Sequence, residues 1–116
     1  MKILVCGDRH WSNVSSIERE LQKFSGDVII IHGAARGADS IAGNVAKGLG
    51  FKVEAYPAKW DKLGIAAGPI RNVQMLEEGK PDLVLAFHPD LNKSRGTSHM
   101  VKIARKAGVK VFCFNN

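Results

Sequence analysis

The fold class is decided by the stretch VIIIHGAARGAD at residues 28–39. It opens with a short apolar run, continues into a turn with two glycines, and ends where a helix-like pattern begins. A continuous apolar run suits a strand that is covered on both faces, as in a parallel sheet. We therefore expect a strand, a glycine-rich turn and a helix in direct succession.

Similar units recur along the whole chain. Short continuous apolar runs occur at residues 3–6, 28–31, 53–56, 83–87 and 109–114. Between these runs, apolar residues repeat every three or four positions, which is typical of amphipathic helices. The alternation predicts one domain over residues 1–116, a Rossmann-like α/β three-layer sandwich in which a five-stranded parallel sheet carries helices on both faces.

Four helices are expected between the strands, each marked by its own apolar spacing. The marking residues are Val14, Ile17, Leu21 and Phe24, then Ile41, Val45 and Leu49, then Ile70, Val73 and Leu76, and last Met100, Val101, Ala104 and Ala107. Pro69 falls in the first turn of the third helix, where its missing N–H costs nothing.

The chain is basic overall, with 17 Lys and Arg against 11 Asp and Glu and a formal net charge of +6. Such a balance favours anionic partners, namely nucleotides, phosphates or nucleic acid, although solubility alone also explains it. No run approaches the about 18 continuous apolar residues that a membrane span needs. The N-terminal MKILVCG is typical of a first strand, not of a signal peptide. We expect no membrane partner and a cytoplasmic location.

Neither a metal nor another cofactor is expected. The cysteines, Cys6 and Cys113, lie in separate apolar runs, and buried free thiols are the expected state of both. The four histidines are scattered along the chain without metal-ligand spacing.

Residue types suited to ligand binding follow the predicted strands. Glycines, arginines, histidines and tryptophans gather at residues 7–11, 32–39, 57–71 and 88–97. In parallel α/β sheets, ligands bind beyond the carboxyl ends of the strands, where the strand order reverses. The clustering therefore predicts a ligand site at this edge of the sheet.

The turn HGAARGAD has the features of an anion site. Gly33 allows a tight exit from the strand, and Gly37 opens the helix with free backbone N–H groups, which attract phosphate or carboxylate. Arg36 could add a bidentate contact. The glycine spacing is not that of the dinucleotide fingerprint GxGxxG. The alternative is that the glycines only form a turn and that Asp39 is only a first-turn acid favoured by the helix dipole.

The loop SRGT at residues 94–97 repeats this logic. Ser94 and Thr97 supply hydroxyls, and Gly96 lets the backbone approach a ligand closely. Thr97 is also expected to cap the last helix. The alternative is a plain helix cap beside an exposed Arg95.

Arg71 and Asn72 are expected in the first turn of the third helix. An arginine there opposes the helix dipole, which suggests that it meets an anion or a carboxylate. The alternative is a salt bridge to Glu54, Asp61 or Asp82.

The tryptophans and a C-terminal group of cations leave two interpretations open. Trp11 and Trp60 each follow a strand and could stack on a base, or form the edge of the core. The cations Lys102, Arg105, Lys106 and Lys110 form a basic stripe that is either a solvated face or a contact for a phosphate backbone.

With these motifs the chain resembles the SLOG superfamily, which contains the DprA (Smf) recombination mediators and the LOG phosphoribohydrolases. It is most similar to the small YspA/YpsA-related branch. The matching pieces, in order, are GDRHW, HGAARGAD, the W…GIAAGPIRNVQM block, DLVLAF and SRGTSHM. The resemblance implies the strand order 3-2-1-4-5 and a pocket for a nucleotide or nucleotide-derived ligand at the strand tips.

The resemblance also implies which residues would carry chemistry. LOG enzymes use a PGGxGTxxE motif whose glutamate works with an upstream arginine to release a base from ribose 5-phosphate. Arg71 is similar to that arginine, and SRGTSHM is similar to the glycine-threonine loop. The glutamate has no counterpart, because Ser98, His99 and Met100 occupy its span. Arg71, Asp39 and His99 remain as candidate catalytic residues.

Three functions are therefore open. The first is a sensor or sequestering module that binds a nucleotide or nucleotide-derived ligand without chemistry. The others are DprA-like binding of single-stranded DNA and LOG-like hydrolysis of N-glycosides or nucleoside monophosphates. A homo-oligomer is compatible with so small a domain, but the sequence specifies no interface. The expected ligand-binding residues are Gly7, Arg9, Trp11, Gly33, Ala34, Arg36, Gly37, Asp39, Arg71, Asn72, Ser94, Arg95, Gly96 and Thr97.

Overall fold

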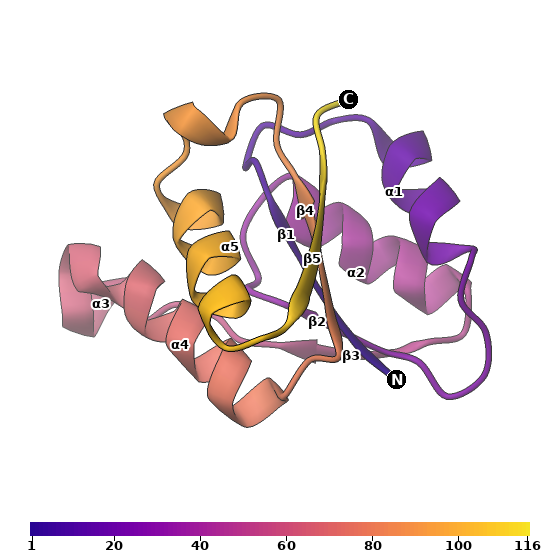
Figure 1. The fold of residues 1–116 in the computed structure, drawn as a ribbon, viewed down its shortest axis with the longest axis horizontal. Coiled ribbons are helices and arrows are strands. Elements are labelled where there is room, and N and C mark those ends of the chain that lie inside the picture. The colour runs from indigo at the N-terminus through magenta and orange to yellow at the C-terminus, as the bar shows by residue number, and fades with distance from the viewer.

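A computed structural model describes residues 1–116 and contains one parallel sheet (Figure 1). Its strands are β1 (Lys2–Gly7), β2 (Ile29–His32), β3 (Lys52–Ala55), β4 (Leu83–Phe87) and β5 (Lys110–Phe114). They lie in the order β3-β2-β1-β4-β5, and every neighbouring pair is parallel. The predicted parallel sheet and its order are confirmed, with the order reversing between β1 and β4.

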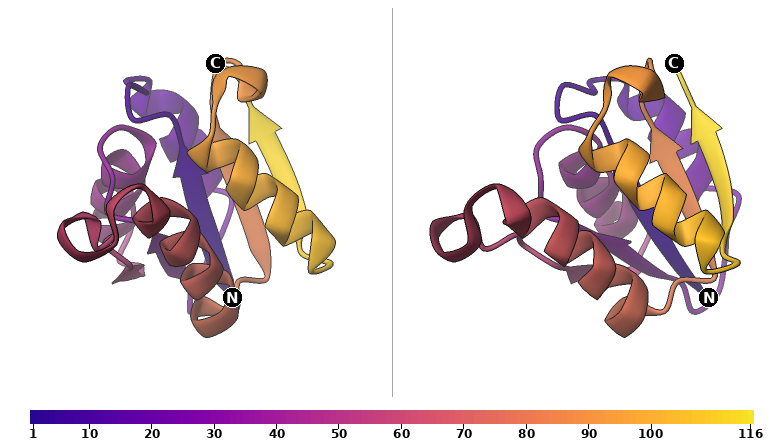
Figure 2. Two further views of the ribbon diagram at one scale, coloured as in Figure 1. Left: turned by 90° about the vertical axis from the view of Figure 1, so that its left-hand side faces the viewer. Right: turned by 60° about the vertical axis from the view of Figure 1, so that its left-hand side comes forward.

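Helices cover both faces of the sheet, so the predicted three-layer sandwich is confirmed (Figures 1 and 2). They are α1 (Val14–Leu21), α2 (Ala38–Gly48), α3 (Trp60–Leu63), α4 (Ala67–Gly79) and α5 (Gly96–Lys106), with short 3-10 turns η1 (Gly64–Ala66) and η2 (Leu91–Lys93). α1 and α2 pack on one face, and α4 and α5 pack on the other. No helix is both long enough and apolar enough to span a membrane.

The short helix α3 was not predicted, because it buries no residue and therefore has no apolar periodicity. It extends away from the body of the domain, ahead of the start of α4 (Figure 2). The sequence predicted Arg71 in the first turn of this helix. Because α4 begins at Ala67, Arg71 lies in the second turn instead. Its position therefore opposes the helix dipole less than the sequence suggested.

The core forms two layers because successive strand residues point to opposite faces. Ile3 and Val5 of β1 pack with α1 and α2, and Leu4 and Cys6 pack with α4 and α5. β5 lies at the edge of the sheet, where Cys113 is exposed. The expectation of a buried thiol was therefore right for Cys6 and wrong for Cys113.

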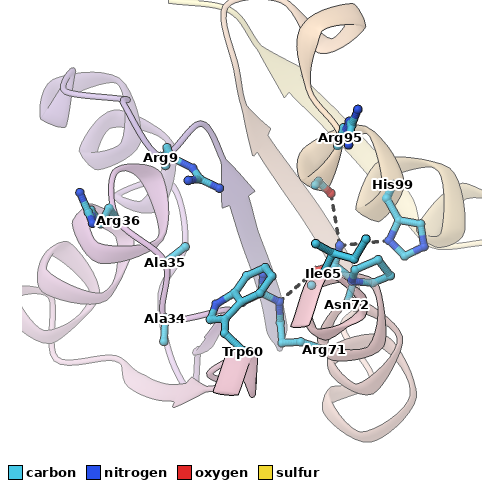
Figure 3. Close-up of a pocket in the computed structure, with 13 residues that line it drawn as sticks. Arg9, Ala34, Ala35, Arg36, Trp60, Ile65, Arg71, Asn72, Arg95 and His99 are labelled. Atoms are coloured by element: carbon cyan, nitrogen blue, oxygen red, sulfur yellow. Dashed lines mark hydrogen bonds between the residues drawn. The ribbon is translucent and has the colours of Figure 1, made fainter. Parts of the chain in front are cut away.

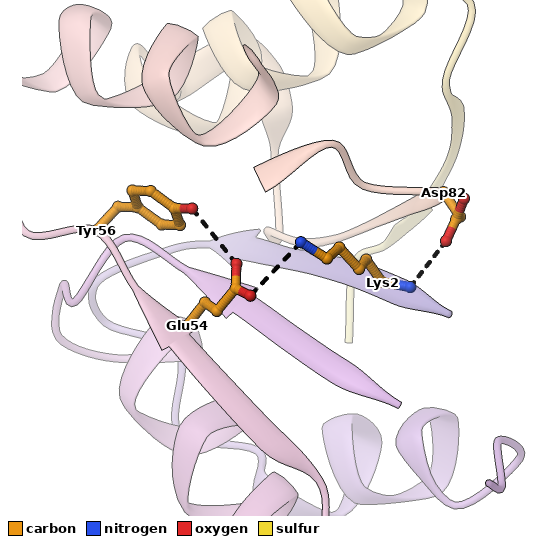
Figure 4. Close-up of polar contacts among 4 residues, drawn as sticks. All are labelled: Lys2, Glu54, Tyr56 and Asp82. Atoms are coloured by element: carbon orange, nitrogen blue, oxygen red, sulfur yellow. Dashed lines mark hydrogen bonds and ion pairs between the residues drawn. The ribbon is translucent and has the colours of Figure 1, made fainter. Parts of the chain in front are cut away.

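A small polar cluster links the start of β1 to β3 and to the residue before β4 (Figure 4). The Lys2 Nζ atom lies 3.5 Å from Glu54 Oε2, and the Tyr56 hydroxyl donates to Glu54 Oε1 at 3.4 Å. The Lys2 backbone N–H donates to Asp82 Oδ2 at 2.8 Å. Glu54 and Asp82 are thus engaged with residues other than Arg71.

Candidate functional site

A pocket of about 790 Å³ lies at the carboxyl ends of β1, β2 and β4 (Figure 3). Its size is within the range of small-molecule sites. It lies beside the β1–β4 boundary, where the strand order reverses, as expected for this class of sheet. The lining residues are Arg9, Ala34, Ala35, Arg36, Trp60, Ile65, Gly68, Pro69, Arg71, Asn72, Arg95, Gly96 and His99.

The lining carries four arginines and no aspartate or glutamate. Arg9 and Arg36 come from the loops after β1 and β2, whereas Arg95 comes from the opposite wall at the start of α5 (Figure 3). These three side chains form no ion pair, because the two salt bridges of the structure join Lys2 to Glu54 and Lys23 to Glu20. The positive charge of these three side chains is therefore not compensated by an ion pair within the chain.

Arg71 is the exception among the four, because the fold holds it in place. One Nη atom donates to the Gly33 carbonyl oxygen, and Nε donates to Asn72 Oδ1 at 3.1 Å. Burial lowers the pKa of Arg71, and the charge of the nearby Asp39 opposes that shift. The salt bridge to Glu54, Asp61 or Asp82 that was considered from the sequence does not form.

Asp39 lies behind the pocket wall and does not line the pocket. Its side chain is 5% exposed, and Oδ2 accepts from the Gly33 N–H at 2.9 Å and from the Ala35 N–H at 3.3 Å. Burial raises the pKa of Asp39 to about 6, while these hydrogen bonds and Arg71 oppose the rise. The Gly33 backbone is thus held at two points, by Asp39 at its N–H and by Arg71 at its carbonyl oxygen.

The backbone N–H groups of the turn after β2 donate within the chain to a greater extent than the sequence suggested. In addition to the two bonds to Asp39, the Ala34 N–H donates to His32 Nδ1 at 2.9 Å. His32 is 9% exposed, and burial lowers its pKa, which favours the neutral ring that this bond requires. Gly33, Ala34 and Ala35 thus donate within the chain, and Arg36 is the charged residue of this turn that lines the pocket.

Gly7 and Gly37 were expected to bind ligand, but neither lines the pocket. A Cβ atom at Gly7 would lie 2.2 Å from the Phe87 carbonyl oxygen, and one at Gly37 would lie 2.3 Å from the Asp8 carbonyl oxygen. Both glycines therefore allow backbone segments to pack closely. This packing brings the loop that carries Arg9 against the start of α2.

Ser94 caps the start of α5, whereas the sequence led us to expect Thr97 in this role. Ser94 Oγ accepts from the Thr97 N–H at 3.0 Å and from the Ser98 N–H at 3.4 Å. Thr97 itself is buried, and neither Ser94 nor Thr97 lines the pocket. The wall at this end is formed by Arg95, Gly96 and His99 instead.

Asn72 joins α4 to the start of α5. Because its Oδ1 accepts from Arg71, its Nδ2 is the donor that reaches the Gly96 carbonyl at 3.2 Å and His99 Nδ1 at 3.1 Å. His99 Nδ1 must then be an unprotonated acceptor. This network fixes the positions of both residues on the pocket wall.

The two tryptophans, for which the sequence left a core position and a ligand-facing position open, differ from each other. Trp11 is 8% exposed, contacts Phe87 edge-on with ring centroids 5.6 Å apart, and donates its indole N–H to the Asn13 carbonyl. It is a core residue that does not line the pocket. Trp60 is 53% exposed and lines the pocket, with its ring packed over Gly68.

Sequence reasoning placed Trp60 on a loop at the correct edge of the sheet but left it out of the expected binding residues, together with Ile65, Gly68 and Pro69. The GIAAGPIR segment after β3 contains Ile65, Gly68 and Pro69 and was the signal in the sequence for these three. No three His, Cys, Asp or Glu side chains are grouped so that they could hold a metal ion.

Three comparisons with known proteins give the relationships of the chain. The family described as "YspA, cpYpsA-related SLOG family" matches residues 1–63. The Gene 61 protein of Mycobacterium phage D29 is 36% identical over 124 aligned residues, which cover 99% of this chain and 97% of that protein.

The X-ray structure of DNA processing protein A (DprA) from Streptococcus pneumoniae superposes with a TM-score of 0.75 at 22% identity. The match covers 97% of this chain and 49% of the DprA chain, so this chain spans about half the length of that protein. This similarity shows the fold, whereas the sequence matches show the family. The chain belongs to the YspA, cpYpsA-related SLOG family.

Proposed function

We propose that the pocket binds a nucleotide or nucleotide-derived ligand and that the protein acts as a sensor or sequestering module. The observation that carries this proposal is the lining of four arginines without a carboxylate. Guanidinium groups bind phosphate through paired, charge-assisted hydrogen bonds. A phosphate between Arg9 and Arg36 on one wall and Arg95 on the other would supply the missing negative charge.

Trp60 and Ile65 give the pocket an apolar side that suits a base. Trp60 is 53% exposed and Ile65 is 94% exposed, although both line the pocket. A base that stacks on an indole gains about 1–3 kcal/mol. We therefore place the base beside α3 and the phosphate beside the arginines.

The same lining favours binding over cleavage. Hydrolysis of an N-glycosidic bond needs a carboxylate to stabilise the charge on the ribose or to activate water, by analogy with glycosidases. The Asp39 carboxylate, which was a candidate, accepts two backbone amides behind the wall. His99, the other candidate acid–base group, has its Nδ1 engaged by Asn72.

Titration with nucleoside monophosphates, nucleoside diphosphates, NAD and ADP-ribose tests the proposal by calorimetry and by tryptophan fluorescence. For any nucleotide that binds, Arg36→Ala is expected to weaken binding about 10-fold or more, because a charge-assisted hydrogen bond contributes about 1.5–3 kcal/mol. Trp60→Phe is expected to abolish the fluorescence change, since Trp11 is buried in the core.

The matched control is Arg19→Ala, which removes the same charge from an exposed position on α1 outside the pocket. It is expected to leave the affinity unchanged. If no member of the panel binds the folded protein, or if Arg19→Ala weakens binding as much as Arg36→Ala, the proposal is wrong.

A second candidate function, binding of single-stranded DNA, is favoured by the outer face of α5. Lys102, Arg105 and Lys106 are all exposed. The helical period places them on the same face as Arg95, which lines the pocket at the start of α5. A strand of nucleic acid that entered the pocket could therefore continue along this helix.

This candidate predicts a strong dependence of oligonucleotide affinity on salt. Each phosphate contact with a single strand contributes about 0.7 to the slope of log affinity against log salt. Lys102→Ala with Lys106→Ala is expected to reduce that slope by about 1.4, as measured by fluorescence anisotropy. Lys47→Ala on α2 is the control and should leave the slope unchanged. Absence of binding in low salt would exclude this function.

A further inference from the structure

The outer face of α4 carries apolar side chains that nothing in the domain covers. Ile70 is 49% exposed and Val73 is 39% exposed, and Leu63 at the end of α3 is 41% exposed. We call these three residues the α4 stripe. Neighbouring apolar side chains exposed together on a small domain are typical of a contact surface.

The α4 stripe exists because α4 packs on the sheet through a different set of residues. Its buried positions are Ala67, Asn72, Met75 and Gly79. A Cβ atom at Gly79 would lie 3.0 Å from the Ile31 side chain, so the helix approaches the sheet closely on this side. Of the three residues whose spacing marked the helix in the sequence, Ile70 and Val73 are thus left facing outward, whereas Leu76 packs against the core.

A shallow groove runs along the α4 stripe and has opposite charges at its two ends. Lys59 lies just before α3, and Glu77 and Glu78 lie in the last turn of α4; all three line the groove. Figure 1 places α3 beyond the amino-terminal end of α4, so the cationic and anionic ends lie apart. None of these side chains, nor Lys62 beside them, forms an ion pair within the chain.

This arrangement is complementary to itself. In a two-fold symmetric contact the same surface serves both copies, so each residue must meet its complement when the partner is turned by 180°. If two α4 helices pack antiparallel across Ile70 and Val73, the lysines of one copy meet Glu77 and Glu78 of the other. An apolar centre with a charged rim is the usual composition of such interfaces.

We propose that the protein forms a homodimer by antiparallel packing of the α4 stripe of one copy on that of a second copy. The dimer adjoins the ligand pocket: Trp60, on the pocket wall, precedes Leu63 by one helical turn, and Arg71 lines both the pocket and the groove. Dimerisation would therefore hold α3 in place beside the ligand. The contact itself requires no ligand, so the dimer and the proposed binding function can fail independently.

The first test measures the mass of the ligand-free full chain by sedimentation equilibrium over a range of concentrations. The wild-type protein is expected to reach twice the chain mass of 12.6 kDa. Ile70→Glu is expected to raise the dimer dissociation constant at least 100-fold while circular dichroism confirms the fold. Phe112→Glu, at a 48% exposed residue on the edge strand β5, is the matched control and should remain dimeric.

The second test reverses the charges at each end of the groove. Lys59→Glu with Lys62→Glu, and separately Glu77→Lys with Glu78→Lys, are expected to be largely monomeric, because like charges then face each other. An equimolar mixture of these two variants is expected to form a heterodimer, since all four contacts become attractive. A wild-type monomer at every concentration, a dimer that Ile70→Glu does not weaken, or a mixture without heterodimer would each overturn the proposal.

Discussion

Replacing Gly37 with alanine is expected to lower the free energy of unfolding by about 3 kcal/mol or more. The residue has φ 70° and ψ −124°, a region that essentially only glycine occupies and that costs other residues about 1–3 kcal/mol. A Cβ atom there would also lie 2.3 Å from the Asp8 carbonyl oxygen and 2.5 Å from the Arg9 carbonyl carbon. Backbone cannot yield as a flexible side chain can, so overpacking adds about 1–3 kcal/mol.

Urea denaturation measures this loss, and Gly48→Ala in the same helix is its control. A Cβ atom at Gly48 meets no heavy atom within 4 Å. Since alanine favours the helix over glycine by about 0.5–1 kcal/mol, this variant should be slightly more stable than the wild type. A Gly37→Ala protein within about 0.5 kcal/mol of the wild type, the usual range for a neutral surface change, would contradict the packing argument.

The strands could be predicted from the sequence because the sheet is covered on both faces. β4 shows this most clearly, since all five of its residues are buried and all five are apolar. The order of the strands could not be read from these runs, which contain no information about neighbours. It came from the resemblance to the SLOG superfamily, and the structure confirms it.

Local sequence patterns could not separate residues that line the pocket from those that support it. Gly37 and Gly96 both precede or begin a helix, yet one packs against backbone and the other lines the pocket. The exposure of Trp11 and Trp60 depends on tertiary contacts, which a single sequence does not contain. Arg9, Arg36 and Arg95, which were expected to bind ligand, do line the pocket, because charged side chains at the carboxyl ends of these strands remain accessible.

Helix α4, the third of the helices expected from the sequence, shows the same limit for packing. Ile70 and Val73 have helical spacing, and such spacing usually marks the buried face. In the structure the small residues Ala67 and Gly79 face the sheet with Met75, because they let the helix approach closely. A sequence with two apolar faces on one helix does not specify which face the sheet covers. The uncovered face is the surface from which the dimer was inferred.

Replacing Asp39 tests how the fold holds the pocket wall. We expect a pH dependence opposite in sign to that of an aspartate whose pKa is lowered by folding. Burial raises the pKa of Asp39 from 3.8 to about 6, so the folded protein holds this proton more tightly than the unfolded chain does. The stabilising contribution is complete below about pH 4 and is lost as the pH rises through about 6. The pKa thus rises by about 2 on folding. At about 1.4 kcal/mol per pKa unit, this rise corresponds to about 3 kcal/mol in the free energy of unfolding.

Asp39→Asn separates the charge from the hydrogen bonds, because its amide oxygen can still accept from Gly33 and Ala35 but cannot ionise. Urea denaturation at several values between pH 4 and pH 7 should show wild-type stability falling relative to Asp39→Asn across this window. Asp39→Ala is expected to be less stable at every pH, by about 1–3 kcal/mol for each buried amide left without an acceptor. Wild-type and Asp39→Asn curves that run parallel would mean that Asp39 titrates in the same way in the folded and unfolded chains. The same carboxylate positions the turn that carries Arg36. Asp39→Ala, which loses the hydrogen bonds, should therefore weaken ligand binding together with stability. Asp39→Asn, which loses only the charge, should leave the pocket geometry in place.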